Sequence, residues 1–293
     1  MDKLIRGMDK NGKIRFFGAI TTELVEEARK IHSAAPVVTA ALGRTLTANA
    51  MMGAALKDEK ESVSIQLKGD GPLATVVTVG NCRGEVRGYV GNNAVDLPLK
   101  PNGKLDVGGS IGRGYLTVVK NLGMRDPYVG RVELQTGEIG DDLTYYFASS
   151  EQTPSIVALG VLVDRDYSVK AAGGYIVQLM PDADEADINM LETTMSYIAP
   201  VTTLIDEGKT IEEITELVFD GFDPVVTDTL CPRYVCNCSR ERIERAIISM
   251  GRNEIQDMIE KDKKAEITCY FCNKVYNFNE NELNEILRKC TKN

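Results

Sequence analysis

The first 178 residues alternate between runs typical of strands and runs typical of helices. Glycine turns separate several β-rich runs before residue 136, which predicts strands. The stretch 37–56 is rich in Ala, Leu and Met with few helix breakers, which predicts a long buried helix. Because helices and strands do not alternate regularly, the pattern predicts an α+β fold with a mixed sheet-and-helix N-terminal domain. The expected strands are KIRFFGAI, SVSIQLKGDGP, LATVVTVGN, GEVRGYVGNN, GYLTVVKNLG and YVGRVELQTG; TTELVEEARK and the stretch near GDDLTYYFASSEQ are expected helices, and IVALGVLVD and YIVQLM are expected central strands.

The middle of the chain, residues 179–230, has a helical pattern. Apolar residues recur there at spacings of three and four, and Pro200 separates two such stretches. The first stretch contains Ile188, Leu191, Met195 and Ile198, and the second contains Ile211, Ile214, Leu217 and Val218.

The C-terminal residues 231–293 predict a small module of helices and one hairpin. SRERIERAII and NEIQDMIEKD are expected helices, and KAEITCYFCNKVYNF is an expected hairpin. NENELNEILRK is expected to close the module as a helix capped by Asn279 or Asn281.

The charge of the chain lies almost entirely in the middle segment. The net charge of −9 divides into +1 for residues 1–178, −12 for 179–230 and +2 for 231–293. The sequence therefore predicts three parts with these boundaries: an N-terminal domain, an acidic helical linker and a C-terminal module. The linker is either a solvated acidic face on a docked helical pair, or a marginal element that detaches when its neighbour stops holding it.

Composition excludes several classes of function. A negative net charge disfavours a general nucleic-acid binder, whose surface is basic. No apolar run is long enough to cross a bilayer, and MDKLIRGMDK has no apolar signal core, so a cytosolic protein without a membrane partner is expected. His32 is the only histidine, which disfavours histidine-based catalysis or a multi-histidine metal site but leaves carboxylate or lysine chemistry open. Taken with the family resemblance described below, no enzyme activity is expected.

The strongest chemical signal is a pair of close cysteine pairs. Cys236 and Cys238 form Cys-x-Cys, and Cys269 and Cys272 form Cys-x-x-Cys after 30 intervening residues. Four thiolates satisfy the tetrahedral coordination of zinc and leave no open position for a substrate, so a closed site holding one zinc ion is predicted. In an extended segment the Cys236 and Cys238 side chains lie on one face.

This zinc site has two interpretations. The first is a purely structural site in a small module. The second is a redox site, because a Cys-x-Cys pair spans about 6.6 Å if extended, close to the ~4.4–6.8 Å that a disulfide tolerates. Metal ligation supplies about 10–16 kcal/mol of folding free energy in small zinc modules, so oxidation of the thiolates would remove that support.

The sequence resembles the bacterial 33-kDa chaperonin family, the redox-regulated heat-shock holdases. The resemblance covers nearly the whole chain and depends on VCNCS and CYFCN, on SSEQTPSIVALGVLV (149–163) and AAGGYIVQLMP (171–181), and on the NEIQDMIEKD helix. It implies a folded, largely inactive, zinc-bound reduced monomer. Oxidants would eject the zinc and form the disulfides Cys236–Cys238 and Cys269–Cys272. The module and linker would then unfold, bind unfolding client proteins without ATP, and dimerise. The resemblance favours the detachable interpretation of the acidic linker.

Two other functions remain open. A thiol-disulfide oxidoreductase also uses Cys-x-x-Cys, and a zinc module can bind nucleic acid, although the charge disfavours the second. The resemblance assigns no role to Cys231, Cys290 or Cys82. Gly108–Gly114 is glycine-rich but lacks the Gly-Lys-Ser/Thr ending of a phosphate loop, so a turn is expected there.

Overall fold

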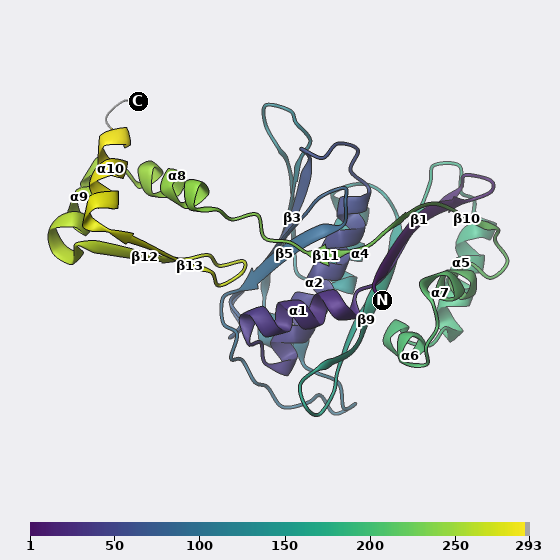
Figure 1. Cartoon of the computed structure of the whole chain (residues 1–293). Coiled ribbons are helices and arrows are strands. Elements are labelled where there is room, and N and C mark those ends of the chain that lie inside the picture. Colours follow the sequence, from purple (N-terminus) through teal and green to yellow (C-terminus); the bar gives the residue numbers. More distant parts are fainter. Residues whose placement is uncertain (291–293) are drawn as a thin grey trace. The chain divides into compact units, whose positions relative to one another are not determined.

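The computed structural model describes residues 1–290 and divides into two compact units (Figure 1). The first unit is Met1–Val235 and the second begins at Cys236. The first contains two sheets and seven helices among the described residues, and its helices and strands are grouped rather than regularly alternating, which confirms the predicted α+β class. Within residues 1–290, no helix combines the length and hydropathy that crossing a bilayer requires.

The first sheet has five antiparallel strands in the order β10-β1-β2-β9-β8. The run YIVQLM lies inside this sheet, within β9, as predicted. The run IVALGVLVD forms β8, which lies at an edge, so its prediction as a central strand is wrong. Its residues Val157 and Val161 are still buried, because α2 and α4 pack on one face of β8 and α6 packs on the other, whereas Leu162 is exposed. The strands are β1 (Lys3–Asp9), β2 (Ile14–Ile20), β8 (Ser155–Val163), β9 (Val169–Leu179) and β10 (Pro224–Leu230).

The second sheet has six strands in the order β11-β5-β4-β3-β6-β7. All its pairs are antiparallel except β11 with β5. The glycine-bounded β-rich runs therefore form strands as predicted. They are β3 (Ser62–Gly69), β4 (Thr75–Gly80), β5 (Glu85–Val90), β6 (Gly114–Asn121), β7 (Tyr128–Glu133) and the two-residue β11 (Arg233–Tyr234).

The long helix α2 (Pro36–Ala54) forms the centre of the first unit. It contacts strands of both sheets, so nearly every one of its side chains is buried, including the polar Thr45 and Asn49. This confirms the buried helix predicted at 37–56. The amphipathic helix α1 (Thr22–His32) packs on α2 and β9, and the short α3 (Val107–Ile111) forms the turn expected in the glycine-rich stretch.

The acidic segment folds onto the first sheet. Its helices are α5 (Glu185–Tyr197), α6 (Val201–Asp206) and α7 (Ile211–Val218), and its end forms β10, hydrogen-bonded to β1. Both predicted helical stretches are confirmed. Leu217 departs from the predicted apolar stripe, since it is 41% exposed whereas its neighbour Val218 is buried.

The second unit contains the predicted hairpin and helices. The hairpin is β12 (Lys264–Thr268) with β13 (Val275–Asn279), and Asn279 caps the closing helix, because its Oδ1 accepts from the Glu282 backbone N–H at 3.1 Å. The helices are α8 (Arg240–Met250), α9 (Arg252–Asp257), the π-helical turn η1 (Met258–Asp262) and α10 (Glu280–Cys290).

A buried carboxylate at the start of α4 (Gly140–Ser149) holds the preceding turn. Asp142 is fully buried, and its Oδ1 accepts from the backbone N–H groups of Gln135 (2.7 Å) and Thr136 (3.1 Å). Its Oδ2 accepts from the Ile139 N–H at 3.0 Å. Ile139 has φ of +69°, which a β-branched side chain rarely adopts, so the Asp142 carboxylate maintains a strained backbone.

We expect Asp142→Ala to lower the free energy of unfolding of the first unit by about 2–4 kcal/mol, because buried N–H groups lose their acceptor. Urea unfolding followed by circular dichroism measures this. The control is Asp141→Ala, an exposed carboxylate in the same helical turn, which should cost less than about 1 kcal/mol. Equal losses in the two variants would contradict the role given to Asp142.

Candidate metal centre

Four cysteine side chains converge in the second unit. The Sγ atoms of Cys236, Cys238, Cys269 and Cys272 all lie within 4.8 Å of one another. The closest approaches are between the two motifs: Cys236 Sγ lies 3.7 Å from Cys269 Sγ, and Cys238 Sγ lies 3.4 Å from Cys272 Sγ. Two segments separated by 30 residues therefore meet at one point, as the zinc prediction requires.

The Cys-x-x-Cys half lies in the turn of the β12–β13 hairpin. The backbone N–H of Cys269 donates to the Lys274 carbonyl at 3.0 Å, which closes the turn. The Cys269 carbonyl in return accepts from the N–H groups of Cys272 at 3.3 Å and Asn273 at 2.8 Å. Asn273 has φ of +56°, a left-handed conformation that asparagine tolerates better than most residues. This tight turn brings both sulfurs to the same side.

The Cys-x-Cys half directly precedes α8. The hydroxyl of Ser239 accepts from the Arg242 backbone N–H at 3.3 Å and so caps this helix. The capped start ends the irregular segment that carries Cys236 and Cys238. Both of its sulfurs reach the same cluster, in agreement with the one-sided arrangement expected from the spacing.

The cluster is part of the small core of the second unit. Cys269 is buried and the other three sulfurs are half-buried. They pack with apolar residues from every element of the unit. The fully buried members of this core are Ile247, Ile255, Phe278 and Leu283. Any change in the state of the sulfurs therefore acts directly on the packing of this unit.

The pKa values of Cys236 and Cys238, which belong to one pair, are shifted in opposite directions. Burial raises the pKa of the Cys236 thiol well above its usual range. Burial opposes ionisation of Cys238 as well, but the Tyr276 hydroxyl, which donates to its sulfur at 3.2 Å, and the adjacent thiols bring its pKa down to about 7. Within this pair, the surroundings favour the thiolate form at Cys238 and disfavour it at Cys236. The alternation of Tyr276 and Phe278 with Asn277 and Asn279 along β13 is the sequence signal for the inward direction of Tyr276, and both aromatic side chains are buried.

The arrangement fits a tetrahedral metal ion. With a Zn–S bond of ~2.3 Å, the sulfurs of a regular tetrahedron lie about 3.8 Å apart. The two closest sulfur pairs, at 3.7 Å and 3.4 Å, are close to that value, and the donor set consists entirely of sulfur. The four cysteines are compatible with zinc, which such a set favours over the oxygen-preferring Mg²⁺ and Ca²⁺.

The remaining cysteines lie outside the cluster. Cys290 belongs to the same unit, at the end of α10, and its Sγ lies 3.8 Å from the Ile248 carbonyl oxygen. Cys82 and Cys231 belong to the first unit, and Cys231 is exposed. The six C-terminal cysteines therefore divide into four that converge and two that do not.

The chain that leads to Cys236 is anchored on the first unit. The Tyr234 hydroxyl donates to the Gly88 carbonyl at 2.8 Å and lies 3.1 Å from Nε2 of His32. The Val235 N–H donates to the Val86 carbonyl at 2.8 Å. His32 lies in the last turn of α1, and its ring contacts that of Tyr234 in this buried anchor. The anchor was not predicted, because two residues are too few to give a strand pattern.

Comparisons with known proteins agree over the full chain. The family model described as "Hsp33 protein" matches residues 2–279. The chain is 52% identical to a 33 kDa chaperonin of Clostridium beijerinckii, with 98% of each chain covered, and 49% identical to one of Clostridium botulinum, with 99% of each covered. The crystal structure of the 33 kDa chaperonin (heat shock protein 33 homolog) of Thermotoga maritima superposes with a TM-score of 0.91 at 37% identity, covering 99% of both chains.

We expect the double substitution Cys269→Ser with Cys272→Ser to reduce bound zinc from about one ion per chain to near zero, because two sulfur donors are lost. Metal analysis of protein purified under reducing conditions measures this, and hydrogen exchange should show lost protection in the second unit. Cys290→Ser is the matched control from the same unit, and it should keep the full zinc content. Loss of zinc in this control would contradict the four-sulfur site.

Proposed function

The chain belongs to the Hsp33 family, and from that premise we propose that it is a redox-regulated, ATP-independent holdase chaperone that acts under oxidative and heat stress. The observation that carries this proposal is the convergence of the four cysteine sulfurs inside the core of the second unit. A family of chaperones also points to a protein that is not an enzyme, with unfolding or partly unfolded proteins as its partners. We place its action in the cytoplasm, without nucleic acid or membrane partners, in keeping with its net charge of −9.

We assign the three parts of the chain different roles. Residues 1–178 are the stable domain, residues 179–230 are the detachable linker, and residues 231–293 are the redox-sensing module, whose compact part begins at Cys236. In the reduced state Cys236, Cys238, Cys269 and Cys272 would hold one zinc ion. When bound, zinc would stabilise the four thiolates and so the fold of the module.

Activation would consist of two disulfide-forming reactions. In each, two cysteine sulfurs give up two electrons to the oxidant and form one S–S bond. Hypochlorous acid is thereby reduced to chloride and water, or hydrogen peroxide to water, and protons are exchanged with the solvent. We propose the pairs Cys236–Cys238 and Cys269–Cys272, by resemblance to the family. Once the four sulfurs form disulfides, they no longer coordinate zinc.

The pairing would depend on opening of the module. In the folded unit the closest sulfurs belong to different pairs, so oxidation without unfolding would favour cross-pair bonds. Once the chain opens, cysteines separated by one or two residues meet far more often than cysteines 33 or 34 residues apart. Disulfides within each pair also leave the two segments unlinked, which is what an unfolding switch needs.

The acidic linker is held by opposing forces. Its apolar residues Ile211, Ile214 and Phe219 are buried against the first sheet, where Phe219 lies 5.0 Å from Phe16 between ring centroids. Its net charge of −12 opposes this docking. Ion pairs between the linker and basic residues in or beside β1, β2 and β9 partly offset that charge. These ion pairs are Lys13 with Asp184 and Asp187 at 2.8 Å, Lys10 with Asp223 at 3.0 Å, Arg6 with Asp228 at 2.8 Å, Lys170 with Asp206 at 2.9 Å, and Lys3 with Glu212.

Detachment of the linker would expose the surfaces that bind clients. Exposed ion pairs are individually worth at most about 1 kcal/mol, so apolar contact is the main force that retains the linker. Unfolding of the module would remove the ordered chain beyond the Tyr234 anchor and let the linker separate. The buried stripe of α7 and the sheet face around Phe16 would then become accessible, and exposed apolar surface of this kind also supports dimerisation of the oxidised form.

We expect oxidised, zinc-depleted protein to suppress the light scattering of a heat-aggregating client without ATP, at about one dimer per client. Reduced, zinc-loaded protein should suppress it several-fold less. Full activity in the reduced form, or zinc retained after complete oxidation, would contradict the redox switch. The competing oxidoreductase function predicts catalytic turnover in a dithiol-dependent insulin reduction assay instead, which we expect to be absent.

We expect Phe219→Ala to release the linker without oxidation. The loss of a buried aromatic costs about 3–5 kcal/mol, comparable to the stability of a marginal element. The reduced variant should suppress client aggregation, and hydrogen exchange should accelerate in residues 185–218. Leu217→Ala is the control, since Leu217 is exposed on the same helix and its variant should still need oxidant. An open linker without client binding would show that clients bind elsewhere.

A further inference from the structure

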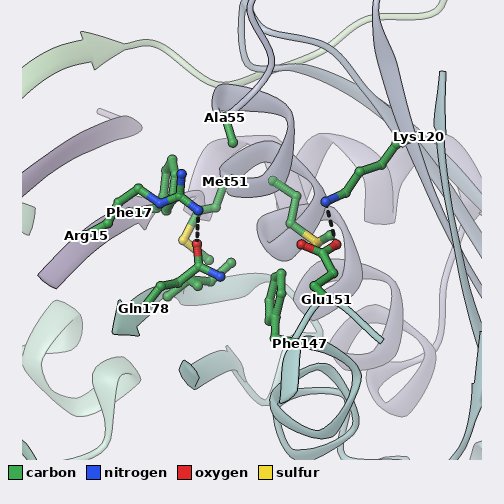
Figure 2. Close-up of a pocket in the computed structure, with 10 residues that line it drawn as sticks. Arg15, Phe17, Met51, Ala55, Lys120, Phe147, Glu151 and Gln178 are labelled. Atoms are coloured by element: carbon green, nitrogen blue, oxygen red, sulfur yellow. Dashed lines mark hydrogen bonds and ion pairs between the residues drawn. The ribbon is translucent and has the colours of Figure 1, made fainter. Parts of the chain in front are cut away.

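A small cavity lies inside the first unit, away from the cysteine cluster. Its volume is about 40 Å³, and its apolar wall includes Phe17, Met51 and Phe147, all buried. Figure 2 shows Arg15 beside Gln178 on one side of the cavity and Lys120 beside Glu151 on the other. The cavity is therefore an apolar chamber with charged groups at two of its walls. Neither the zinc site nor client binding uses it.

Arg15 is a partly buried cation without a carboxylate partner. Its Nη2 donates to Gln178 Oε1 at 2.7 Å, but its buried Nε–H has no hydrogen-bond partner. Among residues 1–290, no carboxylate oxygen lies within 4.0 Å of its guanidinium nitrogens. A buried donor of a charged group that lacks an acceptor is costly, so this guanidinium favours an anion beside it.

The polar groups next to Arg15 have other partners in the structure. Gln178 is buried, and its amide is held in place because Nε2 donates to Ser155 Oγ at 3.1 Å. Glu151 is engaged on the opposite wall, where Oε1 forms an ion pair with Lys120 and accepts from the Tyr146 hydroxyl at 2.7 Å. On its own side of the cavity, the positive charge of Arg15 therefore has no negatively charged neighbour.

The net charge of the cavity wall is positive. Lys120 and Glu151 compensate each other, and nearby Arg6 is paired with Asp228 at 2.8 Å. Burial lowers the pKa of Arg15; the charge of Glu151 across the cavity opposes this shift, and the charge of Arg6 adds to it. A single negative charge placed at Arg15 would make the site neutral.

We propose that this cavity binds a carboxylate group, which accepts hydrogen bonds from Nε–H and another N–H of Arg15. The guanidinium fork matches the planar carboxylate better than a spherical anion. A volume of about 40 Å³ holds roughly three water-sized groups, the size of a carboxylate head with little more than a methyl group. The carboxylate comes either from a free short-chain acid or from the end of a peptide.

The test is thermal unfolding of the full-length, reduced, zinc-loaded protein at constant ionic strength. Acetate is titrated against chloride, and the tripeptide Gly-Gly-Ala is titrated against its C-terminal amide. At tenfold above the dissociation constant, a bound anion should raise Tm by about 3–6 °C. An effect of acetate identifies a free acid, and an effect of the peptide acid alone identifies a peptide terminus. Both results support the carboxylate site.

Two variants make the result specific. Arg15→Met keeps the length of the side chain but removes the charge, and should abolish the shift. Arg131→Met, an exposed arginine over the ring of Tyr115, should leave the shift intact. The Arg15 Nε–H resonance, assigned by its loss in Arg15→Met, should move on addition of acetate to the native protein.

The proposal is overturned if acetate and the peptide acid stabilise no more than chloride and the amide. It is also overturned if Arg15→Met, folded by circular dichroism, responds as the native protein does. An unmoved Arg15 Nε–H resonance at saturating acetate would likewise show that the cavity holds only water.

Discussion

The meeting of four sulfurs at one point in a small core is the constraint on which the second unit depends. Among its described residues, seven form the buried part of that core, and Cys269 is one of them. A core of this size supplies little stability without a metal or a covalent link. In the function we propose, the same four sulfurs would both support the fold and react with oxidants, because thiolates that bind zinc are also the groups that oxidants attack. Loss of one role would then entail loss of the other.

Two opposing interactions determine whether the acidic linker docks on the first sheet: its negative charge disfavours docking, and apolar contact favours it. Segment 179–230 combines a net charge of −12 with helices that bury Leu204, Ile211 and Ile214 in the core at the first sheet. Lys13, the residue before β2, forms ion pairs with both Asp184 and Asp187, so basic residues lie where acidic ones accumulate. In the function we propose, these contacts keep the linker docked but leave it less stable than the core around α2.

Only a short stretch of chain connects the acidic linker to the cysteine cluster. Strand β10 ends at Leu230, the anchor at Tyr234 follows, and Cys236 is the next residue but one. The linker and the first cysteine pair are thus separated by five residues, 231–235, all of which belong to the first unit. The switch we propose would need no long-range path, because the chain that carries the sulfurs directly continues the strand that ends the linker.

Local pattern in the sequence was enough to identify the four converging cysteines, the hairpin that carries Cys269 and Cys272, and the helices of the acidic linker. It narrowed the cap of the closing helix to Asn279 or Asn281, and the structure selects Asn279. These features depend on spacing and periodicity over a few residues, which the chain displays directly. The tertiary structure alone decided that β8 lies at a sheet edge and that Cys236 lies nearest Cys269. It also decided that Tyr276 contacts Cys238 and that Arg15 faces a cavity without a carboxylate partner. Each of these depends on which distant segments pack together, and such pairings are set by the packing of the whole fold rather than by the residues beside them.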